Sequence, residues 1–308
     1  MRDLAYHGKN HLESYLKSYK IILNYLSMSS ETARATLSRR GTKMVQWLSL
    51  GIAVLAAFST PVAAQPPGLV VSVAASVSDA LDEIGRLYRA ATGVTVAINT
   101  GGSHTLARQI VEGAGAGLFL SADDIQMNVV EKAGRLVPGT RTRLLTNELV
   151  VIAPTSSTEI SLAQVLQGRI RRLAMGEPAA VPAGVYGRRW LEHEQSWARL
   201  EKLIVPFPTV RAVLSAVEAG RADAGIVYRT DVAGASVRVV AAIAANEHPY
   251  LDISYPVAVI RGPAESEARR FLDYLKSPAA RAVFTKRGFR FDPAPAPQRE
   301  NRAYGQRR

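Results

Sequence analysis

The sequence predicts an α/β fold in which strands alternate with helices and the sheets are mostly parallel. Short runs rich in Val, Leu and Ile alternate with segments whose apolar residues recur at helical spacing. The chain has 308 residues, enough for about two domains. Hydrophobic residues make up 47% and charged residues 21%, a balance that excludes a largely disordered protein.

The first half of the chain has a βαβαβ order. Four short apolar runs predict strands at residues 69–74, 94–98, 118–120 and 148–153. Ser76 or Ser78 is placed to cap a helix that Gly93 ends. A second helix is predicted over residues 105–112, ended by Gly113. This order indicates a sheet covered by helices.

The second half follows the same style without an internal sequence repeat. Strands are predicted at residues 172–175, 225–228 and 255–260. Helices are predicted at residues 185–194, 265–275 and 278–286. One further helix begins at a cap, Thr209, and ends at Gly220.

Residues 28–64 have the order of a secretory signal peptide. Basic residues come first, then a mostly apolar run over residues 45–58, then small residues up to Ala64. The apolar run is short for a membrane-spanning helix, which needs roughly 20 residues. We expect cleavage near Ala64, with an uncleaved membrane anchor as the alternative. A signal peptide that starts at Met28 keeps its basic segment. We therefore interpret Met28 as the true start of the protein and residues 1–27 as upstream sequence that was included in error.

The net charge of +12 does not describe the folded body. Residues 1–64 carry +5, and residues 293–308, predicted to be a disordered tail rich in Pro and Arg, carry +3. Residues 65–292 keep only +4. This distribution argues against a nucleic-acid-binding protein.

The composition also excludes several kinds of metal and redox chemistry. The chain has no cysteine, so disulfides, thiolate metal sites and cysteine nucleophiles are absent. Only His7 and His11 of the five histidines stand four residues apart, and both lie upstream of the expected signal. We therefore expect no histidine-built metal site.

Neutral donors follow the predicted strands, where ligands bind in open α/β sheets. The side chains are the hydroxyls of Ser76, Ser103 and Tyr228, and several segments there begin helices with free N–H groups. Each feature has a plainer interpretation as a helix cap, a turn or a strand end. Together they favour binding of a small anion, and no catalytic triad or carboxylate pair accompanies them.

Five motifs at these positions resemble the family of periplasmic molybdate-binding proteins of molybdate ABC transporters. The resemblance covers roughly residues 68–290. The motifs are Ala-Ala-Ser-Val-Ser-Asp-Ala (74–80), Gly-Ser-His-Thr-Leu-Ala-Arg-Gln-Ile (102–110), Leu-Phe-Leu-Ser-Ala-Asp (118–123), Val-Pro-Ala-Gly (181–184) and Ala-Asp-Ala-Gly-Ile-Val-Tyr (222–228). The resemblance implies a two-lobed, Venus-flytrap fold of the type II periplasmic binding proteins, with two crossover strands. Lobe I would span residues 65–146 and 256–292, and lobe II residues 147–255.

The resemblance also implies a function and its residues. Molybdate or tungstate would be held by Ser76, Ser103, Ala183, Val210 and Tyr228, with no direct metal ligand and no cofactor. The protein would be a periplasmic monomer, not an enzyme, that delivers the oxyanion to the membrane permease of an ABC importer. The alternative is the same fold tuned to another small oxyanion, such as sulfate, or to a carboxylate.

Three positions depart from the family pattern. Gly115-Ala116-Gly117 stands where the family usually has Pro-Ala-Asp, and Gly176-Glu177-Pro178 where it has Gly-Asp-Pro. His104 follows Ser103 where a small residue is more usual, and we interpret it as a solvated neighbour, with pH dependence near its titration range as the alternative. Neither tripeptide is among the inferred ligand contacts, so we expect these two departures to affect the geometry of the lobes and the hinge more than the binding of the anion.

Overall fold

The computed structural model describes residues 68–157, 159–244 and 247–291. These described residues form one compact unit. The upstream sequence (1–27), the signal peptide (28–64) and the tail (293–308) that the sequence predicts lie outside the described residues. Within the described part of the chain, no helix has the length and apolar character that crossing a membrane requires.

The first sheet has six strands in the order β11-β4-β10-β3-β1-β2. β1 pairs in parallel with β2 and β3, and β10 runs antiparallel to β3 and β4. The strands are β1 (Leu69–Ala74), β2 (Val96–Gly101), β3 (Leu118–Leu120), β4 (Thr142–Thr146), β10 (Ser254–Val259) and β11 (Arg290–Phe291).

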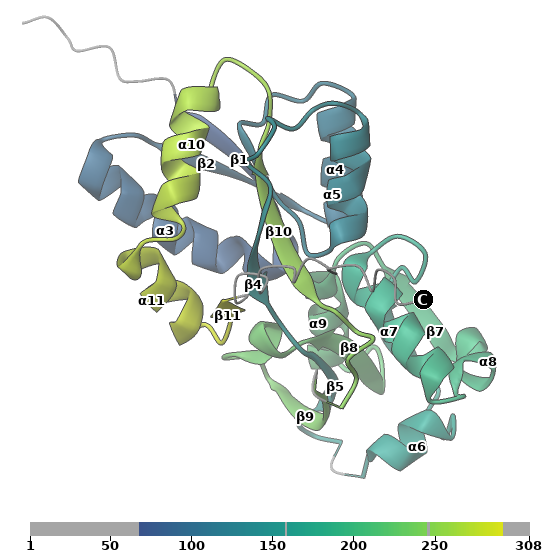
Figure 1. Cartoon of the computed structure of the whole chain (residues 1–308). Coiled ribbons are helices and arrows are strands. Elements are labelled where there is room, and N and C mark those ends of the chain that lie inside the picture. Colours follow the sequence, from purple (N-terminus) through teal and green to yellow (C-terminus); the bar gives the residue numbers. More distant parts are fainter. Residues whose placement is uncertain (1–67, 158, 245–246, 292–308) are drawn as a thin grey trace, which may run out of the picture. The chain divides into compact units, whose positions relative to one another are not determined.

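Helices cover both faces of the first sheet, α4 and α5 on one and α3, α10 and α11 on the other (Figure 1). Successive side chains of a strand point to opposite faces. Phe119 therefore packs with Leu106 of α4 and Met127 of α5, whereas Leu118 and Leu120 join the cluster of the other face. The helices are η1 (Ala75–Val77), α3 (Ser78–Thr92), α4 (Ser103–Val111), α5 (Asp124–Lys132), α10 (Glu265–Tyr274) and α11 (Pro278–Lys286). This sheet and its helices are called the first lobe below.

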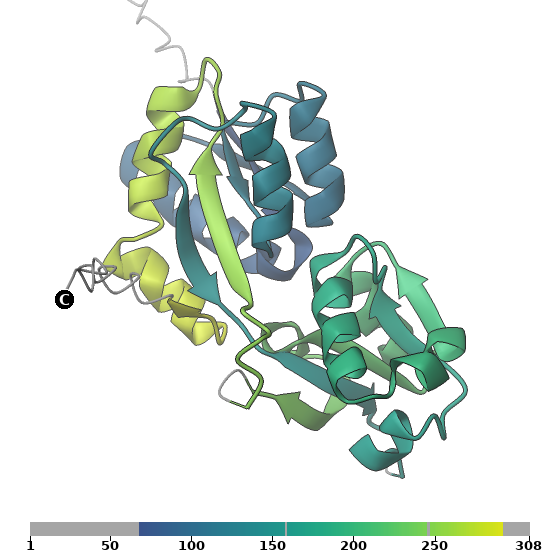
Figure 2. The ribbon, with the colours of Figure 1, turned by 45° about the vertical axis from the view of Figure 1, so that its right-hand side comes forward.

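The second lobe has a five-stranded sheet in the order β7-β6-β8-β5-β9. Figure 2 shows the strands and helices of this lobe in teal and green. Helices α7 and α9 pack on its strands β6 and β8. The strands are β5 (Leu149–Pro154), β6 (Leu173–Gly176), β7 (Ile204–Phe207), β8 (Ala224–Tyr228) and β9 (Val237–Ile243). The helices are α6 (Leu162–Leu166), α7 (Pro182–His193), α8 (Trp197–Leu200), η2 (Glu201–Leu203), α9 (Val210–Glu218) and η3 (Arg229–Val232).

The chain passes between the sheets twice. The first crossover, from β4 to β5, consists of Asn147 and Glu148, and the second, from β9 to β10, spans residues 244–253. The prediction of helix-covered α/β sheets is confirmed. The pairing is more mixed than expected, because β5 and β10, the strands entered from these crossovers, pair antiparallel with their neighbours.

Some of the predicted helix caps and ends are confirmed and others are wrong. Gly93 ends α3 with φ 78°, and Thr209 caps α9 by accepting a 3.2 Å hydrogen bond from the Ala212 N–H. Ser76 and Ser78 were wrong as caps, since neither η1 nor α3 has a side-chain cap bond. Helix α7 begins at Pro182 and not at residue 185, because proline suits the first helical position.

Candidate functional site

One small cavity is lined by both lobes and by all five residues that the sequence predicts for the anion site. Its volume is about 20 Å³, close to the minimum that one water-sized group needs, so it suits a small, compact ligand. No lining residue carries a charge. The lining residues are Ala74, Ala75, Ser76, Gly101, Gly102, Ser103, Ala122, Val181, Pro182, Ala183, Thr209, Val210 and Tyr228.

Four helical segments begin at this cavity. They are η1, α4, α7 and α9, and each has residues of its first turn or its N-cap in the lining. The first N–H groups of a helix have no acceptor within the helix, and the helix dipole adds partial positive charge there. The cavity therefore has the electrostatics of an anion site without a charged side chain in its wall.

Ser103 is the first residue of α4 and does not cap that helix. It is 1% exposed, and its Oγ accepts a hydrogen bond of 3.0 Å from the Ala122 N–H. Because the oxygen is used as an acceptor, the hydroxyl proton remains to be donated into the cavity. The interpretation of Ser103 as a simple cap is therefore wrong.

Ser76 is joined to two residues behind the cavity wall. Its Oγ lies 2.9 Å from the Tyr255 hydroxyl, which in turn accepts a 3.2 Å hydrogen bond from the Asn147 side-chain amide. An anion in the cavity selects the arrangement in which Tyr255 donates to Ser76 and Ser76 donates to the anion. Hydrogen bonds in such a chain polarise one another, so this arrangement strengthens the Ser76 donor.

Tyr228 ends β8, and its hydroxyl has no hydrogen-bond partner among the described residues although the side chain is only 1% exposed. A buried unpaired hydroxyl costs about 1–3 kcal/mol. Burial raises the pKa of the Tyr228 and Tyr255 hydroxyls well above the usual range of tyrosine. Both hydroxyls therefore stay protonated and remain donors.

Two buried carboxyl groups lie near these tyrosines. Burial raises the pKa of Asp231 to about 7, and the neighbouring Arg211 guanidinium opposes this rise. Burial likewise raises the pKa of Asp123 to about 6, against the effect of its hydrogen bond from the Gln126 N–H. A protonated carboxyl group places no negative charge beside an anion, whereas an ionised one repels it.

Arg211 connects the two lobes at the rim of the cavity. It follows Val210 in α9, and its Nη2 donates to Asp79 Oδ2 of α3 at 2.8 Å while its Nε donates to the Ala75 carbonyl oxygen at 3.4 Å. Its Nε also lies 3.4 Å from Asp231 Oδ1. Arg211 thus holds the second lobe against the residues that flank Ser76.

The three departures noted in the sequence have structural counterparts. Burial lowers the pKa of His104, so this residue stays neutral near pH 7. A Cβ at Gly117 would lie 2.6 Å from the Leu69 Cδ1 and 3.3 Å from Ala264, so the glycine lets α10 pack closely. Glu177 donates its N–H to the Phe207 carbonyl oxygen and leads into α7. Gly117 and Glu177 do not line the cavity.

Sequence reasoning missed Tyr255, Asn147 and Arg211. Tyr255 is 179 residues from Ser76, and Asn147 is 108 residues from Tyr255. The predicted strand at 255–260 contained Tyr255, but nothing in one sequence shows which face of a strand meets which loop. Arg211 was visible only as the neighbour of Val210.

The fold and the neutral, donor-lined cavity between two lobes define a solute-binding protein. The family model of bacterial extracellular solute-binding proteins matches residues 69–290, and the chain belongs to this family. The chain is 36% identical over 255 residues to the molybdate-binding protein ModA of Escherichia coli, covering 79% of this chain and 98% of that one. It is 36% identical over 224 residues to a putative ABC transporter substrate-binding lipoprotein, YvgL, of Bacillus subtilis, covering 72% and 85% of the two chains.

Solved structures of solute-binding proteins are also similar to this chain. The periplasmic molybdate-binding protein of Azotobacter vinelandii matches with a TM-score of 0.65 and 26% identity, covering 73% of this chain and all of that one. The substrate-binding domain of a putative molybdenum ABC transporter from Clostridium difficile matches at 0.58 and 30% identity, covering 73% and 99%. A sulfate-binding protein from Mycobacterium tuberculosis, at 0.63 and 15% identity, shares the fold alone.

Proposed function

We propose that this protein captures molybdate or tungstate between its two lobes and delivers the oxyanion to an ABC importer. The observation that carries the proposal is the buried Tyr228 hydroxyl, which lines the cavity and lacks a partner in the described part of the chain. An anion oxygen would accept its proton and relieve the cost of leaving it unpaired.

The proposed ligand contacts are the five residues that the sequence predicts. Ser76, Ser103 and Tyr228 would donate from hydroxyl groups. Ala183 and Val210, at the first turns of α7 and α9, would donate from backbone N–H groups. Neutral donors allow an anion to be bound and released without proton transfer, so we propose a carrier and not an enzyme.

The donor set favours a fully deprotonated tetrahedral anion. No carboxylate lines the cavity. A hydrogen phosphate would need an acceptor for its own proton, and leaving that proton unpaired costs about 1–3 kcal/mol. Molybdate and tungstate meet this requirement, and the relatives named for molybdate support them over sulfate. No resident metal or cofactor is part of the proposal, since molybdenum would be cargo held through its oxygens.

The remaining features of the proposal concern the mature protein. We propose that residues 65–146 and 256–292 act as lobe I and residues 147–255 as lobe II. Cleavage near Ala64 would release a periplasmic monomer, which would present both lobes to a membrane permease. Family membership supports export and a transporter partner.

A thermal-shift panel tests the ligand. Purified residues 65–308 should gain stability with molybdate and with tungstate, and not with sulfate or phosphate. An anion at 100 times its Kd stabilises the folded state by about 2.7 kcal/mol, which corresponds to a rise in Tm of roughly 5–10 °C at this size.

Two results would contradict this proposal. No shift with any oxyanion up to millimolar concentration would reject an anion carrier. A shift with sulfate equal to that with molybdate would reject the selectivity and favour the sulfate alternative.

A further inference from the structure

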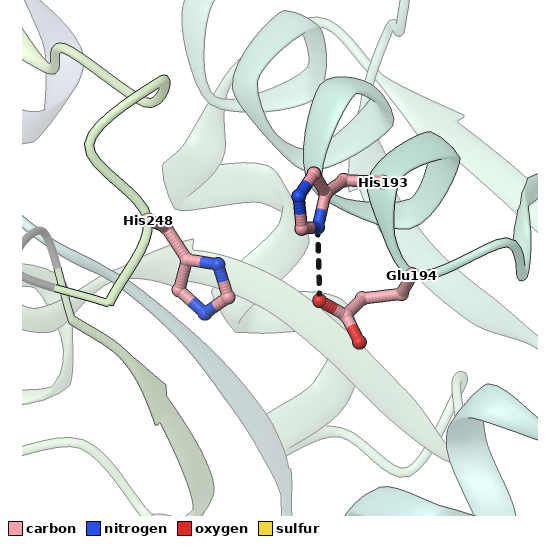
Figure 3. A group of neighbouring side chains, drawn as sticks. All are labelled: His193, Glu194 and His248. Carbon is pink, nitrogen blue, oxygen red and sulfur yellow. Dashed lines mark hydrogen bonds and ion pairs between the residues drawn. The ribbon is translucent and has the colours of Figure 1, made fainter.

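Two histidines and a glutamate meet on the second lobe, away from the cavity, although the spacing of the histidines in the sequence led us to expect no histidine-built metal site. His193 is the last residue of α7, Glu194 follows it, and His248 lies on the second crossover. One ligand atom from each lies within 4.8 Å of the other two. Figure 3 shows the His193 ring above the Glu194 carboxylate, joined to it by the dashed line, and the His248 ring to the left of both.

Tyr250 positions both imidazole rings. Its ring stacks on His193, with 4.3 Å between ring centroids, and its hydroxyl lies 3.0 Å from His248 Nδ1. The His193 and His248 rings meet edge to face at 6.2 Å. Histidines that bind metals commonly have such an outer partner, which fixes the orientation of the ring.

We propose that His193, Glu194 and His248 bind a divalent transition cation of the zinc class. Two imidazole nitrogens and one carboxylate oxygen suit such a cation, and three ligands leave a coordination position for water. His193 Nδ1 lies 3.5 Å from Glu194 Oε1, near the separation of about 3.3 Å between ligands in a zinc tetrahedron.

The cation would fasten the second crossover to α7. These elements already meet through the Tyr186 hydroxyl, which donates to the Asp252 carbonyl oxygen at 3.3 Å. A metal bound at His193, more than one helix turn beyond Tyr186 on α7, would attach the second crossover to this helix at a second point. Because α7 also begins at the anion cavity, this bridge would tie the crossover to a helix that lines the binding site.

Calorimetric titration with zinc chloride tests the site, using residues 65–308 purified without a histidine tag at pH 7.5. This stretch contains all the described residues, which form one compact unit, and it excludes His7 and His11. Residues 65–308 without substitutions should bind one zinc ion. His193→Gln and His248→Gln should each weaken binding at least tenfold, and Tyr250→Phe should weaken it less, since it keeps the stacked ring.

Two control variants separate a built site from surface binding. Glu192→Gln changes a neighbouring carboxylate that pairs with Arg188, and His104→Gln changes the remaining described histidine. Both should keep wild-type zinc affinity. Zinc binding that survives His193→Gln and His248→Gln, or that the controls weaken equally, would overturn the proposal. The molybdate response should be retained in the His193 and His248 variants, so failure of the zinc site is distinguishable from failure of the anion site.

Discussion

Tyr228 contains a phenol that is buried without a partner, and such a group is unfavourable in the empty protein. The lost hydrogen bond to water is not replaced by any described residue. Ser76 and Ser103 differ from it, because both have partners on the protein side. The Ser103 oxygen accepts from the Ala122 N–H, so its proton is free to be donated, and the Ser76 proton would be free in the same way when Tyr255 donates to it.

Tyr228→Phe should weaken molybdate binding about 10–100-fold, since a hydrogen bond to a charged group contributes about 1.5–3 kcal/mol. The same change should leave the empty protein at least as stable as wild type, because it removes an unpaired hydroxyl. Calorimetry with molybdate and thermal unfolding without it measure the two effects. Tyr274→Phe, on α10 of the first lobe, is the matched control. Equal affinities of the Tyr228 variant and wild type would reject the assignment of the site.

Asp231 should make stability depend on pH. Its pKa is about 7 in the folded protein, against 3.8 for an unperturbed aspartate, because it is buried. Between these values the folded state binds more protons than the unfolded state, so stability falls as pH rises from about 4 to about 7. As the pH rises from 5 to 8, the free energy of unfolding of Asp231→Asn should therefore increase by about 2 kcal/mol relative to that of wild type.

Thermal unfolding of both proteins across this pH range measures the divergence. The control is Asp273→Asn, which replaces an exposed aspartate on α10. Its stability should depend on pH in the same way as that of wild type. Parallel curves for wild type and Asp231→Asn would contradict the raised pKa.

At the scale of elements, the start of α7 depends on a glycine. A Cβ at Gly184 would lie 2.1 Å from the Gly176 carbonyl oxygen and 2.7 Å from the Glu177 carbonyl oxygen, both backbone atoms. The end of β6 and the first turn of α7 therefore touch without room for any side chain. This close packing fixes the position of Ala183, which precedes Gly184 and lines the cavity.

Gly184→Ala should shift α7 and weaken molybdate binding by an order of magnitude or more, and should destabilise the fold by at least 1–3 kcal/mol, the cost of overpacking. Gly115→Ala is the matched control, since nothing lies within 4 Å of its Cβ position. Binding and Tm are measured for both variants. A Gly184 variant that matches the Gly115 variant would show that the contact relaxes freely.

Local patterns in the sequence and the family resemblance predicted many elements and five of the residues that line the cavity, but not how the elements meet. β1, β3 and α11 have the bounds expected from their apolar runs and helix signals. β4, β7 and β9 were not predicted: β4 is interrupted by Arg143, β7 carries Pro206, and β9 is only partly buried. The partners of Ser76 and Arg211 come from distant parts of the chain, and no local pattern encodes them.

Across the whole molecule, Arg211 should control how fast the anion leaves. Its bond to Asp79 joins the lobes, and opening must break it. Asp79 is 52% exposed, so the pair contributes at most about 1 kcal/mol. Asp79→Asn should therefore raise the molybdate dissociation rate up to about fivefold, as measured by stopped flow. Arg269→Gln, which breaks an ion pair with Glu265 within α10, is the control. An unchanged rate in Asp79→Asn would assign no such role to the pair.

The two-residue length of the first crossover has a mechanical consequence. Asn147 forms half of it and also donates to Tyr255, behind Ser76, and to Thr230 of the second lobe. Glu148 forms the other half, so a rotation of one lobe against the other turns the backbone at one or both of these residues. We expect that rotation to pull the amide from Tyr255 and to weaken the donor on the anion as the lobes part. Lobe opening and weaker anion binding would then be coupled at Asn147. A permease that separates the lobes would lower the affinity for the anion by the same movement.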